Sequence, residues 1–117
     1  MFKPVLIVAT GSGIGPCLGL FNGIPNLPCR ILWSAKSPEE TYGSAIINIV
    51  YAADPKANII DTTLQKARPN MLRLTKDMYL ESKAEAVCVI SNPKLTKGLV
   101  YDLECEGIPV FAPIWDS

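Results

Sequence analysis

Five short apolar runs, each unbroken and rich in branched side chains, set the strongest limit on how this 117-residue chain can fold. They occupy residues 5–9, 31–33, 59–60, 86–90 and 110–112. A strand with one face in water alternates apolar and polar residues, whereas a strand covered on both faces is apolar throughout, as in parallel sheets. The runs therefore predict the strands of a mostly parallel sheet with helices on both faces.

Helical patterns separate these runs. Residues 37–40 read Ser-Pro-Glu-Glu, a helix start with a capping serine, a proline in the first turn and a glutamate that completes a capping box. Leucines recur every four residues over 95–103, and a Gly-Ile-Pro stop follows at 107–109. Strands that alternate with helices form right-handed βαβ units. The sequence predicts an α/β fold: one three-layer Rossmann-like domain over residues 1–117 with a five-stranded, mostly parallel sheet.

Charge and residue usage exclude several classes of function. Eleven basic and eleven acidic side chains balance to a formal net charge of zero, so no basic field is present to attract a nucleic acid. The chain has no histidine, which removes imidazole catalysis and histidine-based zinc sites. We therefore predict neither a nucleic-acid partner nor a metal site.

The cysteines and the length of the apolar runs indicate the compartment. Cys17, Cys29, Cys88 and Cys105 form no Cys-x-x-Cys pair, and Cys29 and Cys88 lie in or beside apolar runs, as core residues do. Scattered cysteines in a domain of this size favour a reducing compartment over a disulfide framework. Because no apolar run approaches the length of a membrane span, we expect a soluble, cytoplasmic domain.

A glycine-rich turn follows the first apolar run, where parallel α/β domains bind their ligands. It reads Thr10, Gly11, Ser12, Gly13, Ile14, Gly15 and Pro16. Glycines let backbone N–H groups approach a phosphate, and the start of the next helix favours an anion. Two interpretations remain open at this point: a phosphate-binding turn, or a tight connection between a strand and a helix.

The position of the nearest acid separates this turn from the common dinucleotide and methyltransferase turns. Those folds expect an acid at the end of the second strand, where it binds ribose hydroxyls. Here the second run ends in Ser34, Ala35 and Lys36, and the acid, Asp61, follows the third run. Any ribose contact is therefore predicted to come from the end of the third strand.

Three segments resemble a known family. The turn at residues 11–16, the strand and helix start at residues 31–40, and Ser91-Asn92-Pro93 after the fourth run are similar to the pyridine-nucleotide-binding domain of the ferredoxin-NADP reductase superfamily. The resemblance covers essentially the whole chain. More narrowly, the ending at residues 111–117 looks like that of fungal membrane flavoproteins of the TmpA type.

The resemblance implies a domain that binds NAD(P)H within a flavin-dependent oxidoreductase. A separate N-terminal domain of the same protein would hold FAD and receive the hydride, so the chain alone would not turn over. The whole protein would then be cytoplasmic or attached to the cytoplasmic face of a membrane. This domain would be cut from that longer flavoprotein.

The resemblance also implies which residues bind the dinucleotide. Thr10 to Pro16 would face the pyrophosphate and the nicotinamide, Ser34 and Lys36 the adenosine half, and Asp61 the adenosine ribose. An acid at the ribose repels a 2′-phosphate, so NAD(H) is favoured over NADP(H), although Lys66 and Arg68 keep NADP(H) open.

Two further residues would act near the nicotinamide. The family usually carries Cys-Gly after the fourth strand, where this chain has Ser91 and Asn92, followed by Pro93. Ser91 would keep a small polar group beside the ring, and Trp115 would either cover the ring or pack on the last strand. The departure at Ser91 and Asn92 supports a second hypothesis, a degenerate nucleotide-binding fold that acts as a sensing or interaction module without turnover.

Overall fold

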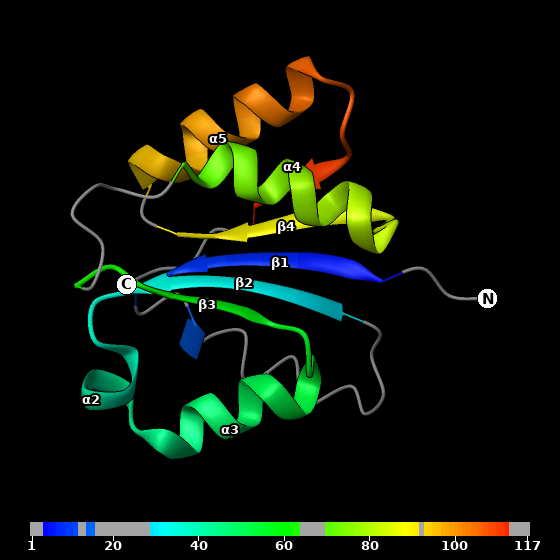
Figure 1. The fold of residues 1–117 in the computed structure, drawn as a ribbon. Coiled ribbons are helices and arrows are strands. Elements are labelled where there is room, and N and C mark those ends of the chain that lie inside the picture. Colours follow the sequence, from blue (N-terminus) through cyan, green and yellow to red (C-terminus); the bar gives the residue numbers. More distant parts are fainter. Residues whose placement is uncertain (1–3, 12–13, 16–28, 64–69, 92, 113–117) are drawn as a thin grey trace.

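A computed structural model describes residues 4–11, 14–15, 29–63, 70–91 and 93–112 of the chain. Strands and helices alternate through most of its length (Figure 1). In chain order the elements are β1 (Val5–Thr10), β2 (Cys29–Ala35), α2 (Pro38–Tyr42), α3 (Ser44–Ala53), β3 (Asn58–Asp61), α4 (Met71–Ser82), β4 (Ala86–Ile90), α5 (Pro93–Cys105) and β5 (Val110–Phe111).

The sheet has the strand order β3-β2-β1-β4-β5, and each neighbouring pair is parallel. The α/β class and the parallel sheet flanked by helices are confirmed. Four strands of four to seven residues make up the body of the sheet. The strand expected at residues 110–112 shrinks to the two residues of β5, which pair with Val87 and Cys88 of β4. The sheet is thus a four-stranded body with a short edge pairing, and not five comparable strands.

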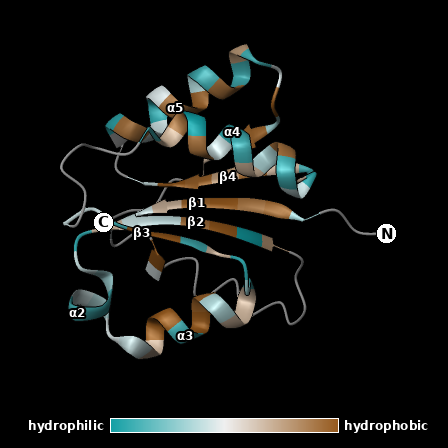
Figure 2. Cartoon of the chain, in the orientation of Figure 1, coloured by the Kyte–Doolittle hydropathy of each residue, from teal (hydrophilic) through white to brown (hydrophobic). Residues whose placement is uncertain are grey.

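Helices cover both faces of this sheet, which explains why its strands are apolar throughout. Helices α4 and α5 lie on one face and α2 and α3 on the other (Figure 1). Successive strand residues point to opposite faces, so Leu6 and Val8 join the core under α4 and α5, while Ile7 and Ala9 join the core under α3. Figure 2 shows these apolar strands between the two helical layers.

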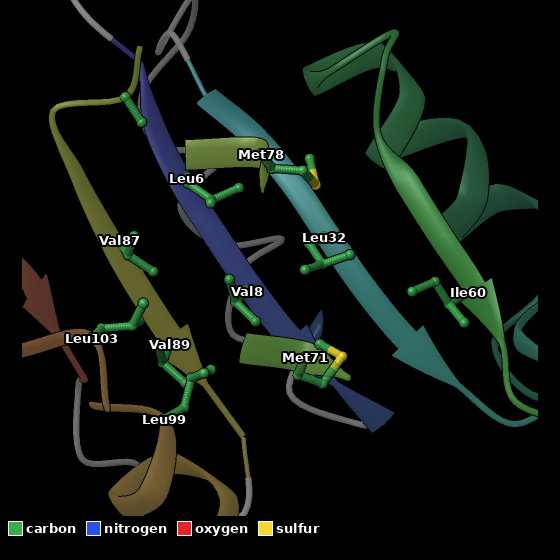
Figure 3. Packing of buried hydrophobic residues seen from close by; sticks show 11 residues of the cluster. Leu6, Val8, Leu32, Ile60, Met71, Met78, Val87, Val89, Leu99 and Leu103 are labelled. Carbon is green, nitrogen blue, oxygen red and sulfur yellow. The ribbon is translucent and has the colours of Figure 1, made fainter. Parts of the chain in front are cut away.

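The core under α4 and α5 holds helix α5 in place. Met71 and Met78 of α4 lie over β1 and β2, and Leu99 and Leu103 of α5 lie beside Val87 and Val89 of β4 (Figure 3). The predicted leucine stripe of this helix is confirmed, because Leu99 and Leu103 are 3% and 0% exposed. The predicted stop is confirmed as well, since Gly107 takes a φ of 76° and its N–H donates to the Glu104 carbonyl at 3.0 Å.

The start of helix α2 differs from the sequence prediction. Ser37 occupies the N-cap position, but its side chain makes no capping bond and its backbone is left-handed, with φ 42° and ψ 62°. The predicted capping box is therefore wrong, while Pro38 does stand in the first turn. A carboxylate from another strand holds the Ser37 backbone instead, as described for the candidate site below.

A buried threonine in α4 offers a test of the core. Thr75 is 0% exposed, and its Oγ1 has no hydrogen-bond partner among the described residues. A buried hydroxyl without a partner lowers stability, and valine replaces it with a methyl group of similar shape. We expect Thr75→Val to raise the free energy of unfolding by about 1 kcal/mol in urea denaturation. Thr41→Val, which removes an exposed hydroxyl bonded to the Lys36 carbonyl, should not raise it. A less stable Thr75→Val variant would contradict the prediction.

Candidate functional site

The polar residues predicted to form a site lie at the carboxyl ends of the parallel strands. Sheet register pairs Thr10 with Ser34 and Ala35 with Asp61. The Ala9–Ile90 pair brings Ser91, the next residue after β4, beside the end of β1. Strand order reverses between β1 and β4, and ligands of open α/β sheets bind in the crevice at this switch point.

Three hydroxyl residues lie in a row at this edge. Oγ1 of Thr10 and Oγ of Ser91 share a hydrogen bond in which either can donate. Val8 and Leu32 pack under α4 and α5, so Thr10 and Ser34, two residues further along each strand, fall on the same face. Ser34 is 7% exposed, while Thr10 and Ser91 are half-buried. Because each hydroxyl both donates and accepts, the row suits a neutral polar ligand group better than a highly charged one.

The turn after β1 is held from the opposite face of the sheet. Gly11 has a φ of 54°, which is a backbone region that glycine adopts at no steric cost. Its carbonyl accepts a hydrogen bond of 3.0 Å from Nε1 of Trp33. Trp33 is fully buried, as its place in the unbroken apolar run 31–33 predicts, and its ring meets that of Tyr42 edge-on at a centroid distance of 5.3 Å. Sequence reasoning missed the bond to Gly11, although a buried indole N–H generally requires an acceptor.

The next described residues of this turn have different surroundings. The Ile14 side chain is 1% exposed and belongs to the core cluster under α3, which leaves its backbone as the part that a ligand could reach. Gly15 is exposed, and a Cβ built there would meet no atom within 4 Å. The core position of Ile14 anchors the chain within the predicted phosphate-binding turn.

Asp61, at the end of β3, organises the turn between β2 and α2. Its Oδ1 accepts hydrogen bonds from the Ser37 N–H at 3.1 Å, the Thr63 N–H at 2.9 Å and the Thr63 hydroxyl at 2.5 Å. The Thr63 hydroxyl bond is the main reason that the pKa of Asp61 lies below its ordinary value. Oδ2 makes no hydrogen bond within the described residues. One carboxylate oxygen therefore stabilises the turn, and the other faces no competing donor there.

The depressed pKa of Asp61 predicts a specific effect of acid. A carboxylate whose pKa falls on folding stabilises the protein above its unfolded-state pKa, and this contribution disappears as the pH falls through the folded value. We expect the wild type to lose stability below about pH 4. Asp61→Asn should lose less over that range because no proton is taken up at this position. Urea denaturation at a series of pH values checks the slopes, and equal acid slopes for the two proteins would contradict the expectation.

The remaining predicted site residues are distributed as follows. Lys36 is exposed immediately after β2, close to the Asp61 turn, and Pro93 begins α5. Five residues lie outside the described part of the chain: Ser12, Gly13, Pro16, Asn92 and Trp115. The same holds for Lys66 and Arg68, which bear on the choice between NAD(H) and NADP(H).

The cysteines within the described residues behave as the sequence predicted where they lie in strands. Cys29 and Cys88 are buried, and burial raises the pKa of the Cys88 thiol to about 11. Burial, followed by the charge of Asp54, raises the pKa of the Cys29 thiol as well. Cys105 is exposed at the end of α5, and Cys17 is outside the described residues. Neither strand cysteine is therefore a thiolate at neutral pH.

The fold and the residues at the carboxyl ends of the strands define a Rossmann-like parallel α/β domain with polar groups at the ends of its strands. A family model described as the C-terminal domain of adenylate-forming reductase 03009 matches residues 1–117, and the chain belongs to this family. It is 44% identical over 118 residues to adenylate-forming reductase 03009 of Coprinopsis cinerea and 43% identical over 117 residues to adenylate-forming reductase 06235 of the same fungus. Each alignment covers 100% of this chain and 11% of the relative.

This family assignment corrects the resemblance drawn from the sequence. The chain is not assigned to the ferredoxin-NADP reductase superfamily or to TmpA-type flavoproteins, and the interpretation as part of a flavin-dependent oxidoreductase is wrong. The names of these relatives mention neither FAD nor a sensing or interaction module, and they support neither interpretation. The motifs behind the resemblance are short turns after strands, which unrelated Rossmann-like domains share because each must connect a buried strand to a helix.

The helices of the described ranges are too short or too polar to cross a lipid bilayer. Those same ranges contain no group of three or more cysteine, aspartate or glutamate side chains arranged to hold a metal ion.

Proposed function

We propose that this domain is the pyridine-nucleotide-binding part of an adenylate-forming reductase and that it takes NAD(H) in preference to NADP(H). The observation that carries the proposal is the arrangement at the strand ends. The Thr10–Ser91 hydroxyl pair, the left-handed Gly11 and the Asp61 carboxylate lie along one edge of a parallel sheet, at and beside its switch point. The printed name of the relatives describes reductases, which need a source of reducing equivalents.

Each part of this edge fits one part of the dinucleotide. The turn that starts at Gly11 and includes Ser12, Gly13, Ile14, Gly15 and Pro16 would lie along the pyrophosphate. Thr10 and Ser91, with Asn92 and Pro93 after them, would bind the polar edge of the nicotinamide. The bound nicotinamide would supply the hydride for the reduction, and the protein's part is to hold and orient it. Trp115 remains a candidate to cover the ring.

The adenosine half of the dinucleotide would bind at the carboxyl ends of β2 and β3. Oδ2 of Asp61 would accept a hydrogen bond from one ribose hydroxyl while Oδ1 stays bonded to Ser37 and Thr63. Ser34 and Lys36 flank this position. The ordinary pKa of an aspartate is far below 7 and that of Asp61 is lower still, so Asp61 is ionised at neutral pH and a 2′-phosphate would meet a negative charge. This repulsion is the physical basis of the preference for NAD(H).

Titration of the ¹⁵N-labelled chain with NADH, NADPH and AMP tests the proposal. We expect NADH to shift the amides of Gly11 and Ser91 and to bind more tightly than NADPH or AMP. Asp61→Asn keeps an oxygen for the Ser37 and Thr63 donors but loses the charge. It should weaken NADH binding about 10-fold and reduce the discrimination against NADPH, since a hydrogen bond to a charged group contributes about 1.5–3 kcal/mol.

The matched control is Asp102→Asn, which neutralises an exposed acid on α5 and should leave the NADH affinity unchanged. The absence of any shift at Gly11 or Ser91 with millimolar NADH and NADPH would overturn the proposal. Equal affinities for AMP and NADH would overturn its dinucleotide part and indicate a site for adenosine monophosphates instead.

A further inference from the structure

Trp33 connects two parts of the candidate site that are distant in the sequence. It lies on β2 opposite Ala9 of β1, on the face covered by α3, and its Nε1 reaches forward to the Gly11 carbonyl at 3.0 Å. The residue is 0% exposed, so water does not reach the donor side of this bond. An indole has a single N–H donor, and here that donor is used on the glycine turn.

Gly11 is the position where such a contact has the most effect. Its φ of 54° begins the glycine-rich turn, and glycine loses more conformational freedom on ordering than any other residue. Fixing a residue such as Gly11 at the moment of binding costs about 1–2 kcal/mol in entropy. A hydrogen bond from a buried donor that fixes the Gly11 carbonyl beforehand transfers part of that cost from binding to folding.

The same indole also contacts the other side of the site. Its ring meets Tyr42 of α2 edge-on, with an interplanar angle of 65°. Helix α2 begins directly after Lys36 and Ser37, and Asp61 holds the Ser37 N–H. Ile14, which is part of the glycine-rich turn, belongs to the same buried cluster as Trp33. A single fully buried side chain thus contacts Gly11, in the segment assigned to the pyrophosphate, and Tyr42, in the helix that follows the residues assigned to the adenosine half.

We propose that Trp33 is a positioning residue that holds the Gly11 turn and helix α2 in the arrangement that binds the dinucleotide. It acts through the Gly11 carbonyl and the Tyr42 ring and does not itself touch the ligand. The inference rests on the proposed function, because its consequence is read as nucleotide affinity. It adds that the donor at Nε1, and not the bulk of the indole alone, sets that affinity.

Trp33→Phe tests this because phenylalanine keeps an aromatic ring on β2 but has no donor. Its matched control is a substitution of Ile31, which is 0% exposed on the same face of the same strand. Of Ile31→Val and Ile31→Ala, the variant whose loss of stability in urea is nearer to that of Trp33→Phe is used. We expect Trp33→Phe to weaken NADH binding about 5- to 10-fold and the Ile31 variant less than 2-fold. Equal weakening by both would reduce Trp33 to a packing residue and overturn the inference.

A measurement on the unmodified side chain keeps the test valid even if Trp33→Phe does not fold. The chain has two tryptophans, so Trp115→Phe identifies the indole resonance of Trp33. We expect saturating NADH to slow hydrogen exchange of the Trp33 indole proton by at least 5-fold, because a nucleotide bound beside Gly11 makes the Trp33–Gly11 hydrogen bond open less often. Unchanged exchange in the presence of bound NADH would overturn the inference alone. Failure of NADH to bind the wild type would instead overturn the proposed function.

Discussion

Asp54→Ala is expected to lower the free energy of unfolding by about 3–5 kcal/mol, a large part of the stability of a domain of this size. Asp54 is 3% exposed and lies after α3, at the edge of the sheet opposite the candidate site. Its Oδ2 accepts hydrogen bonds from the Ile31 N–H at 2.9 Å and from Arg30 Nε at 3.1 Å. Its Oδ1 accepts one from the Lys56 N–H at 3.0 Å. Alanine would leave a buried N–H and a largely buried guanidinium without this partner.

Urea denaturation followed by tryptophan fluorescence measures the effect. Asp54→Asn retains one oxygen acceptor and should lose less stability than Asp54→Ala. Asp102→Ala removes an exposed acid on α5 and should change the free energy of unfolding by less than about 0.5 kcal/mol. If Asp54→Ala stayed within about 1 kcal/mol of the wild type, the Asp54 cluster would not hold β2 and α3 together as the hydrogen bonds indicate.

Leu103→Ala is expected to destabilise the domain by about 3 kcal/mol, within the range that buried leucines show. Leu103 is 0% exposed and packs from α5 against the core that includes Val87 and Val89 of β4 (Figure 3). Its carbonyl also accepts the N–H of Ile108 at 3.1 Å, where the chain turns toward β5. Removing the side chain leaves a cavity beside β4 and weakens the position of this turn.

Tyr101→Ala is the matched control, since Tyr101 lies on the same helix but is 68% exposed. We expect it to change the free energy of unfolding by less than about 0.5 kcal/mol. Amide hydrogen exchange adds a local measure, because Leu103→Ala should speed exchange in β5 more than in β2. Comparable losses for the two variants would contradict the packing of α5 through its leucine stripe.

The chemistry of the strand ends could be predicted further than their geometry. Parallel strands place their carboxyl ends at one edge, so Thr10, Ser34, Asp61 and Ser91 could be grouped from the apolar runs alone. The use of one Asp61 oxygen, Oδ1, for the Ser37 hydrogen bond could not be predicted in this way, because it depends on a Ser37 backbone held in a left-handed conformation. Local pattern favoured a serine cap at this position, and a contact over 24 residues overrode it.

The family assignment shows where motif reasoning fails. Glycine turns, capped helices and polar residues after strands recur in unrelated Rossmann-like domains, because all of these domains solve the same geometric problem. These short segments resemble the ferredoxin-NADP reductase superfamily. The identity of 44% along the whole chain places it instead in the family of an adenylate-forming reductase. Only the full length of the sequence carries enough information to separate families that share such turns.

The sequence alone determined the α/β class and the two-sided burial of the sheet, because hydrophobic periodicity is a local property that each strand carries in its own residues. Tertiary structure decided what the polar and aromatic residues between the runs do. The Trp33 indole donates to the Gly11 carbonyl, and Asp61 accepts from the Ser37 N–H. Asp54 accepts from the Ile31 N–H and from Arg30. Each of these hydrogen bonds joins residues more than 20 positions apart in the sequence. Such bonds exist only once strand register is set, and register is a property of paired strands and not of any one segment.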